Sequence, residues 1–184
     1  MTLLDAPAFD EVRERRHKMI LLNAAGLALV LFVGWWLVAG RPVDWPWNWN
    51  THLRGRMAVN AFFQDLEKND MPAAYGVWMH DKDWQQHPQK YSGYPFARFQ
   101  KDWSSTSPDN DYGVIKSHRI AAARINGNVL MLGIFINDRK SKAINLDYDP
   151  SDHTLSFSPD NMQFFEGPGG ISQLQNETLS GRVL

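Results

Sequence analysis

The stretch VNAFFQDLEKNDMPAAYGVW, from Val59 to Trp78, decides the fold of the soluble part of this chain. Its first apolar residues recur at i, i+3, i+4 and i+7, the spacing that aligns side chains along one face of an α-helix. These residues are Val59, Phe62, Phe63 and Leu66. The stripe predicts an amphipathic helix over 54–69 that faces a hydrophobic core. Asp70 then predicts the cap of a second short helix, in which Pro72 occupies an early position that needs no N–H.

A third helix and a β-sheet follow this helical pair. The segment 95–103 places three aromatic residues on one helical face. The periodicity then changes to two, and the Asn-Gly pair at 126–127 is a strong hairpin signal. It precedes the apolar run 129–136, VLMLGIFI, which is typical of a central strand, and a further strand over 143–148. Helices followed by antiparallel strands predict an α+β fold with the helices packed on one face of the sheet.

The end of the chain predicts less regular structure. In the strand over 143–148, Asp147 lies between the apolar positions Leu146 and Tyr148, so it is expected to point to solvent. The segment 159–184 contains GPGG and then a Ser/Gln/Asn-rich stretch. Because it has little apolar content to bury, we expect a flexible tail there.

A long uncharged apolar run, MILLNAAGLALVLFVGWWLVA at 19–39, precedes the helical pair. A helix rises about 1.5 Å per residue, so this run spans roughly 32 Å against a hydrocarbon core of about 30 Å. A cleaved secretory signal is the alternative, but its apolar part usually has about 7–15 residues and ends in small residues. Since this run is longer and reaches Trp35 and Trp36, we expect an uncleaved, single-pass transmembrane helix.

Charged and aromatic residues orient this span. Four basic residues lie just before it, whereas Arg41 alone follows closely. Because basic residues favour the cytoplasmic side, the tail 1–18 is expected in the cytoplasm and the C-terminal domain in the periplasm, anchored to a cell inner membrane. Residues 40–53 are rich in Trp and Pro and predict a stiff juxtamembrane linker before a domain at 54–158. The expected membrane-interface residues are Arg15, Arg16, Lys18, Trp35, Trp36, Trp45, Trp47 and Trp49.

The composition of the chain excludes several classes of function. The chain has 19 Lys and Arg against 20 Asp and Glu, a net charge of −1, and no cysteine. It therefore has no basic field for nucleic acid. The lack of cysteine excludes disulfides, thiolate metal sites and a cysteine nucleophile. The length leaves room for one ordinary domain beside the anchor.

The helical pair from Val59 to Trp78, followed by PFARFQKDW and a strand meander, resembles the NTF2-like superfamily over about 55–158. In that superfamily a long helix with an F-x-x-L core leads through an acidic turn into an Ala-Tyr helix. The resemblance implies an NTF2-like cone, in which helices pack on a curved antiparallel sheet around a pocket. The layout of short tail, one span and exported domain is similar to VirB8-type components of type IV secretion systems.

The resemblance also implies a place for chemistry, because relatives such as ketosteroid isomerase use this pocket for proton transfer. Such a site needs a carboxylate or histidine base in an apolar cavity and a donor to the developing oxyanion. The pocket candidates are His80, Asp83, His118 and Tyr148, and they form no diagnostic pair. The histidines also lack the tight spacing on one element that is typical of metal ligands, so we expect neither a metal nor a cofactor.

Two interpretations follow. In the first, a bitopic membrane protein presents a non-catalytic domain as an interaction or assembly subunit of a membrane complex. Its partners would be the bilayer and other membrane or periplasmic proteins, self-association is compatible with it, and Tyr91 and Tyr94 are candidate contacts. In the second, the protein is an exported small-ligand binder or an isomerase-like enzyme. A filled apolar cavity favours the first, and an open cavity lined by a buried carboxylate favours the second.

Overall fold

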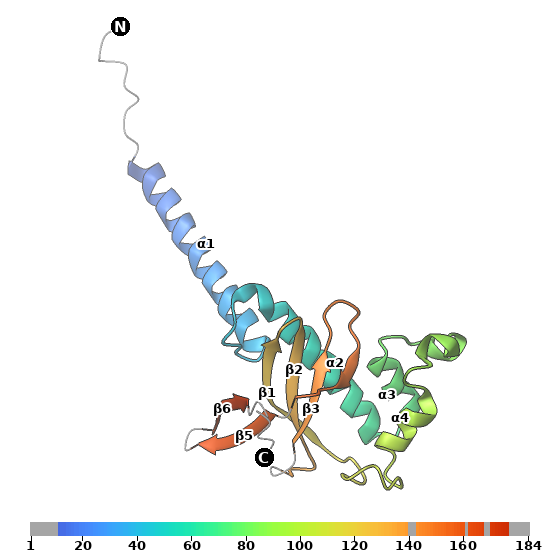
Figure 1. Cartoon of the computed structure of the whole chain (residues 1–184). Coiled ribbons are helices and arrows are strands. Elements are labelled where there is room, and N and C mark those ends of the chain that lie inside the picture. Colours follow the sequence, from blue (N-terminus) through green and yellow to red (C-terminus); the bar gives the residue numbers. More distant parts are fainter. Residues whose placement is uncertain (1–10, 140–142, 161, 168–169, 177–184) are drawn as a thin grey trace, which may run out of the picture. The chain divides into compact units, whose positions relative to one another are not determined.

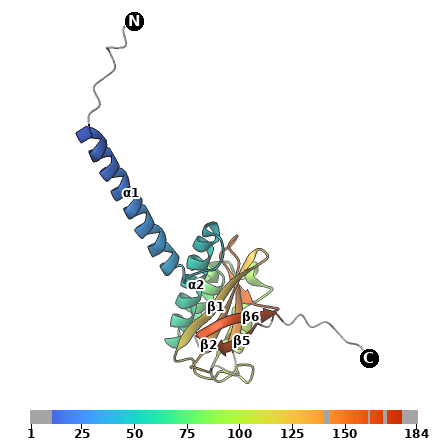
Figure 2. The ribbon, with the colours of Figure 1, turned by 90° about the vertical axis from the view of Figure 1, so that its left-hand side faces the viewer.

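The structure, a computed structural model, describes residues 11–139, 143–160, 162–167 and 170–176 (Figures 1 and 2). The chain divides into two compact units, Met1–Arg41 and Pro42–Leu184. Among the described residues, the first unit contains one helix, and the second contains the remaining helices and all strands. Each unit is therefore described by itself.

The first unit consists of α1 (Glu11–Val38). Its segment Arg13–Val38 is the one helix in the described part of the chain that is long and apolar enough to cross a membrane. None of its most apolar stretch is buried. Leu21 and Leu22, for example, are 68% and 71% exposed. By length and composition, α1 could therefore span a bilayer, as predicted from 19–39.

The second unit begins its helical structure earlier than the sequence predicts. A 3-10 turn, η1 (Pro46–Asn48), leads directly into α2 (Trp49–Glu67), so the helix starts at Trp49 instead of 54. Trp49 is only 6% exposed, and its indole N–H donates to the Asp44 carbonyl at 2.8 Å. Burial of this indole supports the extra helical turn, and Trp49 is a buried residue instead of the expected interfacial one. Trp45 and Trp47 remain exposed and stack with ring centroids 5.0 Å apart.

The predicted core stripe of α2 is confirmed. The exposed fractions of Val59, Phe62 and Phe63 are 0%, and that of Leu66 is 4%. The stripe packs with α3 (Met71–Trp78) and α4 (Phe96–Trp103). Asp70 caps α3 as predicted, because its side chain accepts a hydrogen bond from the Ala73 N–H at 3.1 Å. Between α3 and α4 lie two 3-10 turns, η2 (Trp84–Gln86) and η3 (Pro88–Tyr91).

Four antiparallel strands form the main sheet in the order β1-β2-β3-β4. Their bounds are β1 (His118–Asn126), β2 (Val129–Ile136), β3 (Ala143–Tyr148) and β4 (Leu155–Phe157). Gly127, with φ of 59°, lies in the predicted hairpin turn between β1 and β2. The apolar run forms the central β2, which is almost entirely buried. α2 runs along one face of this sheet (Figures 1 and 2), so the α+β prediction is confirmed.

A second, two-stranded sheet lies within the segment predicted to be a flexible tail. It pairs β5 (Met162–Gly167) with β6 (Gly170–Asn176). The sequence predicts a flexible tail over 159–184, and the described residues of that segment include these two paired strands. Gly167 of β5 pairs with Gly170 of β6 across the strand ends.

Candidate functional site

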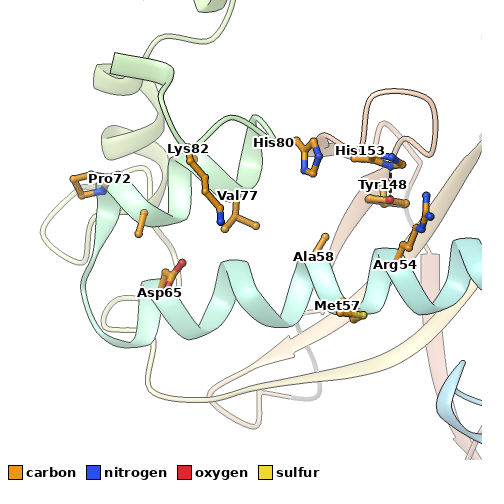
Figure 3. Close-up of a pocket in the computed structure, with 12 residues that line it drawn as sticks. Arg54, Met57, Ala58, Asp65, Pro72, Val77, His80, Lys82, Tyr148 and His153 are labelled. Atoms are coloured by element: carbon orange, nitrogen blue, oxygen red, sulfur yellow. Dashed lines mark hydrogen bonds between the residues drawn. The ribbon is translucent and has the colours of Figure 1, made fainter. Parts of the chain in front are cut away.

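A groove of about 990 Å³ runs along one side of α2 in the second unit (Figure 3). Its α2 residues are Arg54, Met57, Ala58 and Asp65. They lie on one flank of the helix, beside the core stripe, because their spacing is i, i+3, i+4 and i+11. Met57 is 62% exposed, so an apolar side chain faces solvent there. The hollow is an open groove that the core does not fill.

The opposite wall comes from α3 and consists of small or compact side chains. They are Pro72, Ala73, Gly76 and Val77. Asn69 adopts φ of 58° in the turn after α2, which lets α3 reverse direction and pack beside α2. A Cβ added to Gly76 would lie 3.2 Å from the carbonyl oxygen of Asp81. A larger residue there would push against the loop that follows α3, so the glycine permits the close packing of this wall.

Three ring side chains gather at the Arg54 end of the groove (Figure 3). A hydrogen bond of 2.7 Å joins the Tyr148 hydroxyl to His153 Nδ1. His80 follows α3 in the chain, and the centroid of its ring lies 5.1 Å from that of the His153 ring. Tyr148 is only 2% exposed, and this burial raises the pKa of its hydroxyl, while nearby Arg54 acts in the opposite direction. The hydroxyl therefore stays protonated at neutral pH and serves as a hydrogen-bonding group.

The charged residues of the groove are mostly cationic. Arg54 and Lys82 are both exposed, and among the described residues neither is ion-paired with a carboxylate. Asp65 is the one carboxylate in the described lining, and its Oδ1 lies 3.6 Å from Lys68 Nζ. The groove therefore combines apolar walls with an excess of positive charge.

The structure brings together two of the four pocket residues predicted from the sequence. His80 and Tyr148 line the groove, whereas Asp83 and His118 do not. Asp83 is an exposed residue at the start of η2, and its N–H donates to Asp81 Oδ1 at 2.9 Å. Within the described residues, no group of three or more His, Asp or Glu side chains is placed to hold a metal ion.

His118 instead fastens the start of β1 to α2. Its Nδ1 lies 2.7 Å from Glu67 Oε1, and its Nε2 lies 3.1 Å from Asn60 Oδ1. Its ring also stacks on Phe63, with centroids 5.1 Å apart. Since both ring nitrogens and one ring face are engaged, this side chain holds the helix on the sheet.

The expectation that Asp147 points to solvent is wrong. Asp147 is only 8% exposed, and burial raises the pKa of its carboxyl group. Ser158 offers it a side-chain hydrogen bond, but Oδ1 has no partner among the described residues. Because side chains alternate along β3, Asp147 lies on the other face of the strand from Leu146 and Tyr148. All three residues are buried, so both faces are covered at this end of the strand. This buried carboxyl group therefore lies away from the groove.

The aromatic loop before α4 does not present its tyrosines freely. Tyr91 is 9% exposed, and its hydroxyl donates to Asp81 Oδ2. The Tyr94 hydroxyl donates to Asp102 Oδ2 at 2.8 Å, and this tyrosine is half-buried beside a second hollow of about 510 Å³. Both side chains brace the loop, and Tyr91 leaves little surface exposed, so the role of Tyr91 and Tyr94 as partner contacts stays a prediction.

Comparison with known proteins adds no identity to this geometry: no protein-family model, curated protein or solved structure matches the chain. The resemblance to the NTF2-like superfamily therefore stays a prediction. The charged groove residues that sequence reasoning missed include Arg54 and Lys82. The side of α2 on which Arg54 lies can be predicted from the sequence. The opposite wall of the groove cannot, because its position depends on how α3 folds back.

Proposed function

We propose that this chain is a bitopic membrane protein whose second unit is a non-catalytic interaction or assembly subunit of a membrane complex. In this proposal α1 spans the inner membrane with the N-terminus in the cytoplasm, and the α+β domain, an NTF2-like cone, lies in the periplasm. The basic residues before the span and their near absence after it support this orientation.

The open groove beside α2 is the observation that carries the binding role. A groove with exposed apolar side chains and two cations that form no ion pair with a described carboxylate gives a partner both area and electrostatic attraction. The exposed apolar surface of α1 supports the membrane location, because such a helix is far more stable in hydrocarbon than in water. An anchor also raises the effective concentration of the domain for a partner in the same membrane.

A second candidate function is binding of a small ligand, or isomerase-like chemistry, at the Tyr148 end of the groove. The Tyr148–His153 hydrogen bond beside His80 favours it, because these rings could orient a ligand. Proton abstraction needs a base in an apolar, water-excluding site. Asp65, the one carboxylate in the described lining, lies near Lys68 in an open groove, and this supports binding more than chemistry.

Complementation distinguishes the two functions. In cells that lack the chain, the full-length protein should restore the phenotype, and an exported domain without 1–41 should fail at equal abundance. Tyr148→Phe removes one oxygen atom and should retain most activity if the domain acts by binding. Tyr112→Phe is the matched control, because Tyr112 lines the second hollow and not the groove. Loss of function in Tyr148→Phe, with normal fold and membrane level, would favour the enzyme. Full complementation by the anchorless domain would contradict the membrane-subunit proposal.

A further inference from the structure

The walls of the α2–α3 groove define the shape of what it can bind. From Arg54 to Asp65 the α2 wall extends about 16 Å at 1.5 Å per residue, which is about three helical turns. The facing wall includes Ala73, whose small side chain lets another backbone approach closely, whereas the Cβ position of Gly76 faces the Asp81 carbonyl. A trough between two helices, apolar along its length, is the shape that accepts the apolar face of a third helix.

The openness of the groove argues against a small molecule as its main occupant. Small-ligand pockets bury about 70–90% of the ligand surface, usually in enclosed volumes of about 300–1,000 Å³. The groove volume of about 990 Å³ lies at the upper end of that range, but the groove is open along its side, since Met57 at its edge is 62% exposed. A helix that lies along the groove would cover the whole length of the groove, including the Met57 side chain. A compact ligand would leave most of the groove in water.

The charged side chains of the groove indicate which charge a partner should carry. Arg54 projects toward the end formed by Tyr148 and His153, and Lys82 projects into the groove from the α3 side (Figure 3). Neither is ion-paired with a described carboxylate, and Asp65 already lies near Lys68. Acidic side chains on a bound helix would therefore meet unpaired cations, whereas basic ones would be repelled.

We infer that the α2–α3 groove is a docking site for an acidic amphipathic helix of a partner protein. The inference rests on the proposed interaction function and names its partner class. The docked helix has about three turns, apolar residues at i, i+3, i+4 and i+7 against Ala58, Ala73 and Val77, and carboxylates beside Arg54 and Lys82.

A displayed library of 14-residue helices tests this inference with the full chain in nanodiscs of zwitterionic lipid. The library keeps Leu at i, i+3, i+4 and i+7 and varies each polar-face position among Glu, Gln and Lys. We expect selected clones to be enriched in Glu. We expect their affinity to fall at least about tenfold on the double variant Arg54→Glu/Lys82→Glu, which reverses the attraction.

The matched control is Lys116→Glu/Arg124→Glu, which makes the same change of net charge at exposed residues outside the groove. It should change the affinity by less than about twofold. Selection of Lys-rich clones, absence of enrichment over empty nanodiscs, or an equal loss on the control variant would overturn the inference. Binding of dodecanoate in the groove without any helix binding would also overturn it, in favour of a small anionic amphiphile.

A cellular arm separates this inference from the proposed function. If a partner co-purifies in a fixed ratio with the wild-type chain and equally with Arg54→Glu/Lys82→Glu, the domain is an interaction subunit but the groove is not its docking site. If helices bind the groove but no protein accompanies the chain in its own membrane, the proposed function fails while the binding site stands.

Discussion

Replacing Phe62 with alanine removes the centre of the aromatic core. Phe62 is fully buried, and its ring centroid lies 5.0 to 6.1 Å from four neighbouring rings. These rings belong to Phe63, Trp78, Phe99 and Trp103. Deleting a buried Phe side chain costs about 3–5 kcal/mol in lost transfer energy and cavity formation. Because α2, α3 and α4 would have to move together to close the cavity, we expect the upper part of this range, from a typical total of about 5–15 kcal/mol.

Urea denaturation of the fragment 42–184, followed by tryptophan fluorescence, measures this loss. Trp78 and Trp103 contact the Phe62 ring and should report the transition. Met57→Ala, on the same helix but 62% exposed, is the control and should change the free energy of unfolding by less than about 0.5 kcal/mol. Phe62→Leu should give a smaller loss than alanine and keeps the comparison possible if the alanine variant does not fold. A loss below about 1 kcal/mol for Phe62→Ala would refute the assigned core.

Four further predictions concern the cap, a buried acid, the helix–sheet clamp and the anchor. Asp70→Ala removes the α3 cap and should lower the free energy of unfolding by about 0.5–2 kcal/mol in the same urea assay, whereas an unchanged value would show that the cap does not stabilise the domain. Burial raises the pKa of the Asp147 carboxyl group above its ordinary value of 3.8, so its ionisation lowers the free energy of unfolding as the pH rises above that value. Asp147→Asn should therefore melt at a higher temperature than the wild type at pH 7, with the difference shrinking toward pH 3.8, and a lower melting temperature at pH 7 would contradict this. His118→Phe keeps a ring on Phe63 but loses two hydrogen bonds, and should cost about 1–3 kcal/mol; unchanged unfolding would remove the clamp from the account. A reporter active only outside the cytoplasm should work at the C-terminus and fail at the N-terminus, whereas a soluble product starting near Arg41 would reveal a cleaved signal.

Local patterns in the sequence predicted much of the fold. The stripe that includes Phe62, the Asp70 cap, the turn at Gly127 and the apolar β2 each depend on residues close in sequence, and each is confirmed. The start of α2 could not be predicted, because the burial of Trp49 depends on tertiary packing that overrides the polar, Pro-containing appearance of 40–53.

The candidate site was less accessible to sequence reasoning. Asp147 alternates correctly along β3, but alternation predicts solvent exposure only when one face of a sheet is open, and here both faces are covered. The groove arises from two helical flanks brought together by the turn at Asn69. No spacing in the sequence connects Arg54 with Lys82 or His153, so the excess of positive charge became visible only in three dimensions.

Purification of the full-length chain from its own membrane in mild detergent tests the central claim most directly. The chain should remain in the membrane fraction at its full mass and elute with at least one other protein in a fixed ratio. That partner should be lost when the chain is expressed without 1–41, because untethered encounters are far less frequent. A full-length chain that elutes alone, as a monomer, would contradict the account and favour the small-ligand function of the groove.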